Sequence, residues 1–371
     1  MSSQRIAVLF GGRSGEHEVS LRSASSIINA LKENKHEVFP VGITREGKWL
    51  AGGDPMAALQ SGNIPGECHA ASVITDPVSP GFLLWHEKEG GGREIVSFEK
   101  VDLVFPVLHG TYGEDGAVQG LLDMAGLPYI GAGVLASATG MDKVVMKDLF
   151  IRGGLPVGEY YYFLGNEWLS KKDKLLEKIE KKLAYPCFIK PANLGSSVGI
   201  SKAYSRQELI AGVEEALLYD EKVVVEAFIP GREVECSVLG DLEPFASLPG
   251  EIIPNTDFYD YHSKYIDDRS ELIIPAKLSP EIIEEVKRLS VKAFKILSVS
   301  GMARVDFFVD SDNNKILINE INTIPGFTNI SMYPKLWEAS GLSYSKLVGN
   351  LVKIALERYR RRSSLITSPP I

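Results

Sequence analysis

The sequence predicts two architectures in succession along one chain of 371 residues. The first is an α/β unit with a doubly wound parallel sheet, and the second is an α+β unit. Strand-like apolar runs alternate with helical patterns in the first part, which is typical of a parallel sheet. After Pro156 the strand-like runs come in adjacent pairs separated by helices, which favours antiparallel pairing. At roughly 100–200 residues per domain, the length predicts two or three domains.

The first part opens with RIAVLF (5–10), a continuous apolar run typical of a strand buried on both faces. After GGRSGEHEVS, the residues Ile27, Ile28 and Leu31 lie at helical spacing. HEVFPVGI and VDLVFPVL are predicted strands, and EDGAVQGLLDMAG is a predicted helix that ends at Gly126. Residues 62–98 interrupt the alternation with glycine- and proline-rich turns, so we interpret them as a hairpin insertion without chemistry.

The second part contains strand-like runs that we expect to pair with their neighbours. These runs are VGEYYYF, then CFIKP with VGISKAY, and KVVVEAFI with REVECSVLG. Helices are predicted near 168–183 and 205–219, and a long helix from Ser279, which would cap it ahead of Pro280. The hairpin GMARVDFFVDSDNNKILINEIN and the C-terminal helices follow.

Composition and charge exclude several classes of protein. A net charge of −8 argues against a nucleic-acid binder, which normally has a basic face. No apolar run approaches the ~18 residues of a membrane helix, and we expect no signal peptide. Cys68, Cys187 and Cys236 are odd in number and far apart, which predicts reduced, packed thiols and a cytoplasmic protein. We interpret the basic cluster RYRRRSS (358–364) as a solvated, frayed tail.

A loop of small residues, PANLGSSVGI (191–200), follows Lys190 between two predicted strands. It lacks the GK[ST] of a Walker loop and the strand–helix setting of a Rossmann turn. In a hairpin such a loop can fold over polyphosphate, with backbone N–H groups and the hydroxyls of Ser196 and Ser197 as donors and Lys190 as a point charge. An ordinary glycine hairpin remains an equal alternative.

The late hairpin carries the stronger pattern. In a strand, residues two apart share a face, so Arg304 and Asp306 lie together, as do Glu320 and Asn322. A turn near Asn313 places Asp306 opposite Glu320 and Arg304 opposite Asn322. Neighbouring carboxylates repel unless a cation bridges them, and oxygen ligands favour Mg²⁺ or Mn²⁺ over zinc. The alternative is solvated charge on an exposed strand pair.

Two further groups of acids have open interpretations. Glu226 ends an apolar strand and Glu233 begins the next one, so they could bind an adenine amino group and ribose hydroxyls, or equally be solvated turn acids. Glu16 and Glu18 stand at the start of a helix, where acids offset the helix dipole without any further function.

Seven stretches occur together in one order: GGRSGEHEVS, LHGTYGEDGAVQG, MDK, FIKPANLGSSVGISK, FYDYHSKYIDD, GMARVDFF and INEINTIPGFTNISMYP. On these the chain resembles the D-alanine–D-alanine ligases, ATP-grasp enzymes of peptidoglycan synthesis, over nearly its whole length. The resemblance implies an N-terminal α/β domain (1–140), a central ATP-grasp subdomain (141–231) and a C-terminal one (232–371), with ATP between their sheets. The 62–98 insertion looks like the longer of two family forms.

The resemblance also implies the ligands of ATP and metal. Two Mg²⁺ or Mn²⁺ ions would be held by Asp306, Glu320 and Asn322, with Glu320 bridging. Some relatives have a lysine where this chain has Ala227, so the contact on that side of adenine is open. The implied ATP-binding residues are Lys143, Lys190, Ser196, Ser197, Val198, Glu226, Ala227, Phe228, Ile229, Glu233 and Asn319.

By the same resemblance, ATP phosphorylates one D-alanine to an acyl phosphate, which the amine of a second D-alanine attacks. Glu16 would hold the first ammonium, with His109 nearby in a role left open. Arg304 and the Gly326 N–H would form the oxyanion site. Ser331 and Lys264 would hold the second carboxylate.

The segment 257–269 is a predicted lid, in which Tyr265 would join Ser196 and Glu16 in one hydrogen-bonded chain. By the same resemblance, the presence of Tyr265 implies D-alanine rather than D-lactate as acceptor. The alternatives are a D-alanine–D-lactate ligase, another ATP-grasp dipeptide ligase, or a non-catalytic ATP-binding module. We expect D-alanine and ATP as small-molecule substrates, no nucleic acid or membrane partner, and a homodimer.

Overall fold

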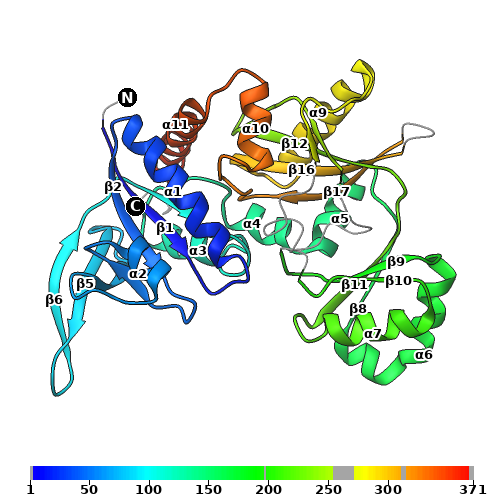
Figure 1. Ribbon diagram of the computed structural model, residues 1–371, viewed down its shortest axis with the longest axis horizontal. Coiled ribbons are helices and arrows are strands. Elements are labelled where there is room, and N and C mark those ends of the chain that lie inside the picture. The colour runs from blue at the N-terminus through cyan, green and yellow to red at the C-terminus, as the bar shows by residue number, and fades with distance from the viewer. Residues whose placement is uncertain (1–2, 196–197, 254–270, 311–314, 367–371) are drawn as a thin grey trace.

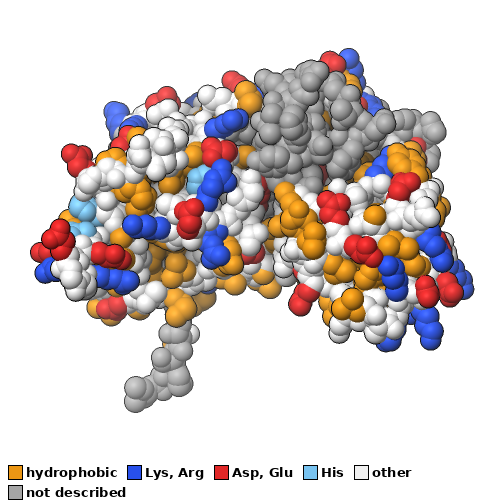
Figure 2. Space-filling view, turned by 60° about the horizontal axis from the view of Figure 1, so that its bottom comes forward, with side chains coloured by type: hydrophobic (Ala, Val, Ile, Leu, Met, Phe, Trp, Pro, Cys, Tyr) orange, Lys and Arg blue, Asp and Glu red, His pale blue; other side chains and the backbone are white. Residues whose placement is uncertain are grey.

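The structure is a computed structural model that describes residues 3–195, 198–253, 271–310 and 315–366. Three sheets follow one another along the chain (Figure 1). The predicted succession of α/β and α+β parts is confirmed. Figure 2 shows Lys, Arg, Asp and Glu side chains interspersed over the described part of one face, rather than gathered by sign.

The first sheet has the strand order β6-β5-β4-β3-β2-β1-β7. Its strands are β1 (Arg5–Gly11), β2 (Glu37–Ile43), β3 (Trp49–Ala51), β4 (His69–Ile74), β5 (Gly81–Glu87), β6 (Arg93–Glu99) and β7 (Leu103–Val107). The predicted parallel pairing holds for β1 with β2 and β7, while the other neighbours pair antiparallel. The residues 62–98, expected as a hairpin insertion, form β4, β5 and most of β6, which pair antiparallel in succession and extend this sheet.

Helices α1 (His17–Glu33), α2 (Pro55–Ser61) and α3 (Ala117–Met124) belong to the first part of the chain. The buried side of α1 includes the predicted Ile27 and Leu31. The C-terminal helices α10 (Met332–Ala339) and α11 (Tyr344–Ser363) return to this region, and α11 lies beside α1 (Figure 1). One core joins β1, β7, α1 and α11.

The prediction that the basic cluster at 358–364 is a frayed tail is wrong, because most of this cluster lies in α11. Arg358 is buried and donates to the carbonyl oxygens of Gly131 and Tyr129. Arg361 and Arg362 pair with acids elsewhere in the chain. Sequence position suggested a loose end, whereas Arg358 and Arg362 bind this helix to the N-terminal part and Arg361 binds it to Asp241, just after β12.

The second sheet has the order β10-β9-β11-β8, and all its neighbours are antiparallel. Its strands are β8 (Tyr160–Leu164), β9 (Cys187–Pro191), β10 (Ser201–Ala203) and β11 (Lys222–Ala227). Helices α6 (Gly165–Lys182) and α7 (Arg206–Ala216) match the two predicted ones and share its core. All three cysteines are buried free thiols, as predicted.

The third sheet has the order β15-β14-β12-β16-β17, with β13 beside β12. Its strands are β12 (Arg232–Gly240), β13 (Phe245–Ala246), β14 (Gly250–Ile253), β15 (Glu271–Ile273), β16 (Gly301–Val309) and β17 (Ile316–Asn322). Helices α4 (Val134–Met141), α5 (Lys143–Arg152) and α9 (Pro280–Ile296) pack in this part. Ser279 is the N-cap of α9, as predicted.

The expected pairing of KVVVEAFI with REVECSVLG is wrong. The first run forms β11 in the second sheet and the second run forms β12 in the third sheet. Residues 228–231 therefore cross from one sheet to the other, and this crossing positions the candidate site. Within the described residues, no helix is long and apolar enough to span a membrane.

Candidate active site

The β16–β17 hairpin places its polar residues as the sequence predicted. Arg304 is opposite Asn322 and Asp306 is opposite Glu320. The register shifts at Asp306, so that Phe307 faces Ile318 and Asn319 is the extra residue of a bulge. Bulges re-aim side chains near functional sites.

Arg304 is held between two carboxylates on neighbouring strands. Its Nε and Nη2 atoms each donate to an oxygen of Asp306 at 2.7 Å. Its Nε atom also lies 2.9 Å from Glu235 Oε2. Glu235 lies on β12 opposite Asp306, and sequence reasoning missed it. The sequence did contain a signal for Glu235: it lies two residues after Glu233, and residues two apart on a strand share one face.

The described residues contain no group of three or more His, Cys, Asp or Glu side chains suited to a metal ion. The hairpin offers two carboxylates and one amide, Asp306, Glu320 and Asn322. Magnesium usually combines one or two protein carboxylates with substrate phosphates and water, so this donor set fits Mg²⁺ or Mn²⁺ bound together with ATP.

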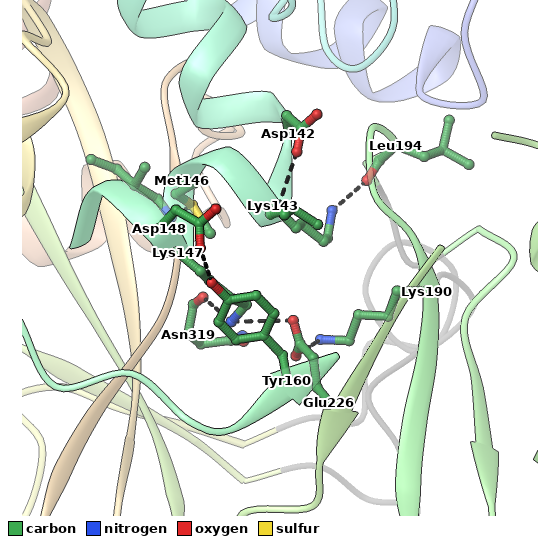
Figure 3. A network of polar contacts seen from close by, with 12 residues as sticks. Asp142, Lys143, Met146, Lys147, Asp148, Tyr160, Lys190, Leu194, Glu226 and Asn319 are labelled. Carbon is green, nitrogen blue, oxygen red and sulfur yellow. Dashed lines mark hydrogen bonds and ion pairs between the residues drawn. The ribbon is translucent and has the colours of Figure 1, made fainter. Parts of the chain in front are cut away.

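A cluster of buried lysines faces the hairpin from α5 and β9 (Figure 3). Lys143 follows Asp142, whose side chain caps α5, and its Nζ atom donates to Leu194 O at 2.7 Å. Burial lowers the pKa of Lys143. A buried ammonium beside a cavity is suited to an anionic phosphate, as predicted for this residue.

Lys190 and Lys147 both bind Glu226, at the end of β11 (Figure 3). Lys190 Nζ donates to Glu226 Oε2 at 2.8 Å, and Lys147 Nζ lies 3.1 Å from Glu226 Oε1. Burial alone would raise the pKa of Glu226, but the two lysines lower it to about 2. Lys147 also donates to Asn319 O at 3.0 Å, which links the second sheet to the bulge in the third. Sequence reasoning missed Lys147, although its i+4 spacing from Lys143 puts both on one side of α5.

The crossing segment lines the cavity beside Glu226. The N–H groups of Ala227 and Phe228 donate to Glu159 O and Pro186 O, so neither is directed at a ligand. The Phe228 ring lies 6.3 Å from that of Phe188. This apolar lining fits the predicted contact with a flat base.

Glu16 lies at the N-cap of α1, and its side chain is buried. A Cβ at Gly110 or Gly195 would come within 2.7 or 3.0 Å of Glu16 Oε2. The start of α1, the loop after β7 and the small-residue loop therefore approach one another at this carboxylate. The dipole interpretation did not anticipate this position.

Gly326 and Ser331 follow the hairpin. Ser331 is the N-cap of α10, and its Oγ atom accepts from Thr328 N at 3.1 Å. A Cβ at Gly326 would lie 3.1 Å from Ser331 Oγ.

His109 is buried and does not itself line the cavity, and both of its ring nitrogens are within hydrogen-bond distance of protein atoms. Burial lowers its pKa, although Glu16 and the bond to Ile324 act in the opposite direction. Glu114, which sequence reasoning missed, lines the cavity, and burial and the charge of Glu16 raise its pKa.

One cavity of about 690 Å³ lies where the second and third sheets meet the start of α1. Most of the predicted site residues line it: Glu16, Lys143, Lys190, Glu226, Ala227, Phe228, Ile229, Glu233, Arg304, Asp306, Asn319, Glu320, Asn322, Gly326 and Ser331. A second cavity of about 430 Å³ adjoins it at Glu16 and contains Val198. Ser196, Ser197, Lys264, Tyr265 and the predicted lid 257–269 lie outside the described residues.

Comparisons with known proteins show which family this chain resembles over its length. The family model described as "D-ala D-ala ligase N-terminus" matches residues 5–132, and "D-ala D-ala ligase C-terminus" matches residues 149–353. The chain is 51% identical to the D-alanine–D-alanine ligase of Natranaerobius thermophilus over 98% of this chain and 97% of that protein. It is 49% identical to that of Caldicellulosiruptor bescii, over 98% of both chains.

Solved structures give the same result. The D-alanine–D-alanine ligase of Coxiella burnetii superposes with a TM-score of 0.82 at 36% identity, covering 98% of this chain and 97% of the other. The VanG D-Ala:D-Ser ligase of Enterococcus faecalis superposes with a TM-score of 0.84 at 36% identity, covering 95% and 100%. With both family models matched and full-length relatives at about half identity, this chain belongs to the D-alanine–D-alanine ligase family.

Proposed function

We propose that this chain joins two D-alanine molecules to D-alanyl-D-alanine, with conversion of ATP to ADP and phosphate, for peptidoglycan synthesis. The observation that carries the proposal is the single cavity that unites buried lysines, the Asp–Glu–Asn hairpin and Glu16. These are the charges needed to bind a triphosphate, a divalent cation and an ammonium group together.

At the nucleotide end, Lys143 and Lys190 neutralise the phosphates, and Ser196, Ser197 and Val198 close over them. Glu226 accepts a hydrogen bond from the adenine amino group, and Glu233 binds the ribose. The base lies against the segment 227–229. Because Lys190 pairs with Glu226 at 2.8 Å, ATP binding turns this lysine from the carboxylate towards phosphate.

At the reacting end, Asp306, Glu320 and Asn322 supply oxygen ligands for two divalent ions. Such ions, when bound, neutralise the charge that develops on the transferred phosphoryl group. Arg304, fixed by Asp306, adds a guanidinium close to the same place.

Glu16 binds the ammonium of the first D-alanine and directs its carboxylate to the phosphoryl group. Ser331 and Lys264 bind the carboxylate of the second D-alanine, whose amine attacks the acyl phosphate carbon. Arg304 and the Gly326 N–H stabilise the oxyanion, phosphate leaves, and Tyr265 with Ser196 closes the lid over Glu16. In many enzymes, hydrogen-bond donors held in advance at such a position make the largest single contribution to the rate enhancement.

Release of phosphate from ATP, measured with and without D-alanine, tests this function. We expect release that depends on D-alanine, with the dipeptide identified by mass spectrometry. ATP binding without turnover at any D-alanine concentration would instead identify a non-catalytic ATP-binding module.

A second candidate differs in the acceptor, because a structural neighbour at a TM-score of 0.84 is a D-Ala:D-Ser ligase. Competition of D-alanine with D-serine and with D-lactate, at equal concentrations and neutral pH, separates the three. We expect the D-alanyl-D-alanine product to predominate.

Three expectations stay predictions that belong to this proposal. Light scattering of the purified protein checks the homodimer, and fractionation of cells checks the cytoplasmic location. Limited proteolysis checks the division near residue 231, between β11 and β12, where early cleavage is expected; the division at residue 140 falls within α4, where it is not.

A further inference from the structure

Three buried polar side chains of the N-terminal part bind the main chain just after the hairpin. Glu114 Oε1 accepts from the N–H of Ile324 at 3.1 Å, and His109 Nδ1 lies 2.9 Å from Ile324 O. Ser23 Oγ accepts from the N–H of Phe327 at 3.1 Å and lies 3.2 Å from His109 Nε2. All three side chains are at most 7% exposed.

The partners fix the proton positions in this network. A carbonyl oxygen only accepts, so His109 Nδ1 carries the hydrogen that Ile324 O receives. Burial lowers the pKa of His109 and so favours the neutral ring, in which Nε2 accepts from the Ser23 hydroxyl, whose oxygen in turn accepts from Phe327. The result is one directed chain through a neutral imidazole.

The bound segment has a particular place in the site. It runs from Asn322, the last residue of β17, to Gly326 and Phe327, and it has no regular secondary structure that would satisfy its main chain. Phe327 is also fixed at its carbonyl, which accepts from Tyr344 Oη at 2.6 Å. Gly326 therefore lies between two residues whose main-chain groups are held from outside the segment.

We propose that Ser23, His109 and Glu114 are positioning residues for the ligation: they fix the direction of the Gly326 N–H towards the oxyanion. Through them α1, which begins beside Glu16, and the third sheet, which carries Arg304, are held in one geometry. This proposal rests on the proposed function, in which the Gly326 N–H contacts the reacting carbonyl.

Two substitutions of His109 separate the two bonds of its ring. The side-chain amide of Asn can replace the Nδ1 donor, so His109→Asn keeps the bond to Ile324 O. The longer Gln places its amide near the Nε2 position, so His109→Gln keeps the bond to Ser23 and loses the bond to Ile324. Because small misplacements of catalytic groups cost up to about 100-fold in rate, we expect kcat to fall roughly 10- to 100-fold in His109→Gln and by much less in His109→Asn.

The measurements are kcat, the KM for ATP, and hydrogen exchange of the peptide that contains residues 324–327. In His109→Gln we expect faster exchange and lower kcat, with the KM for ATP unchanged, because the nucleotide end is untouched. Ser23→Ala and Glu114→Gln should show the same pattern in weaker form, which keeps the test open if His109→Gln folds poorly. Ser290→Ala is the control, since its buried hydroxyl donates to Val286 O within α9 and its loss should leave kcat unchanged.

Each outcome is decisive. Unchanged exchange at 324–327 in His109→Gln would overturn the positioning role. Faster exchange with unchanged kcat would leave these residues with a structural role alone and also overturn it. Wild-type protein without D-alanine-dependent phosphate release would instead overturn the proposed function, and exchange of the same peptide would still report on the three bonds.

Discussion

Replacing Lys147 with Met removes one of the two cations that stabilise Glu226, while keeping most of the side chain's volume. The carboxylate is buried, and Lys147 lies 3.1 Å from it and donates to Asn319 O at 3.0 Å. Lys190 still binds the other carboxylate oxygen, so Glu226 is not left alone. A hydrogen bond to a charged group contributes about 1.5–3 kcal/mol, and we expect a loss of about 2 kcal/mol in the free energy of unfolding.

The larger effect should be on ATP. In the proposed complex Lys190 turns to phosphate, and in Lys147→Met this would leave Glu226 without a lysine. The same 1.5–3 kcal/mol then opposes binding, which corresponds to roughly 10- to 100-fold weaker affinity for ATP. The pKa of Glu226 should rise from about 2, because one of its two cations is gone.

Calorimetric titration with ATP and urea unfolding measure the two effects. Lys353→Met is the matched control, since this lysine is exposed on α11 and its pair with Glu357 is at 3.8 Å. Wild-type ATP affinity in Lys147→Met would refute the reasoning, because it would mean that Lys190 stays on Glu226 when ATP binds.

Three other predictions concern separate parts of the molecule. Glu320→Gln should abolish turnover with the fold intact, because the charge that bridges the metal ions is lost. A kcat near the wild-type value at saturating magnesium would contradict the metal assignment. Chelation with EDTA should abolish the activity of the wild type. Burial lowers the pKa of His109, so the folded protein loses stability as the pH falls below the unfolded value of 6.5. Because Asn does not titrate, His109→Asn should lose less free energy of unfolding over the same pH range. In urea unfolding, the difference from the wild type should be at most about 1.4 kcal/mol per pH unit. Arg358→Met should lower the free energy of unfolding by about 2–4 kcal/mol, because the carbonyls of Gly131 and Tyr129 lose charged donors; an unchanged midpoint in urea would mean that α11 is held by its apolar face alone.

Much of the site follows from local pattern. The strand period of two and a short turn suffice to place Asp306 opposite Glu320, and the structure has that register. The same period relates Glu235 to Glu233, and the helical period relates Lys147 to Lys143. These two residues could therefore have been inferred as neighbours of the site, although not the groups that they bind.

What the sequence determined by itself is thus many of the strands and helices, the succession of α/β and α+β parts, and the polar face of the hairpin. Periodicity and capping act over a few residues, so they can be recognised without the fold. Only the tertiary structure decided that β11 and β12 belong to different sheets, that the basic segment is a docked helix, and that His109 bonds Ile324 across 215 positions of sequence. Such contacts arise because buried main-chain groups must find partners wherever packing brings a donor or acceptor, and no local pattern records which partner that is.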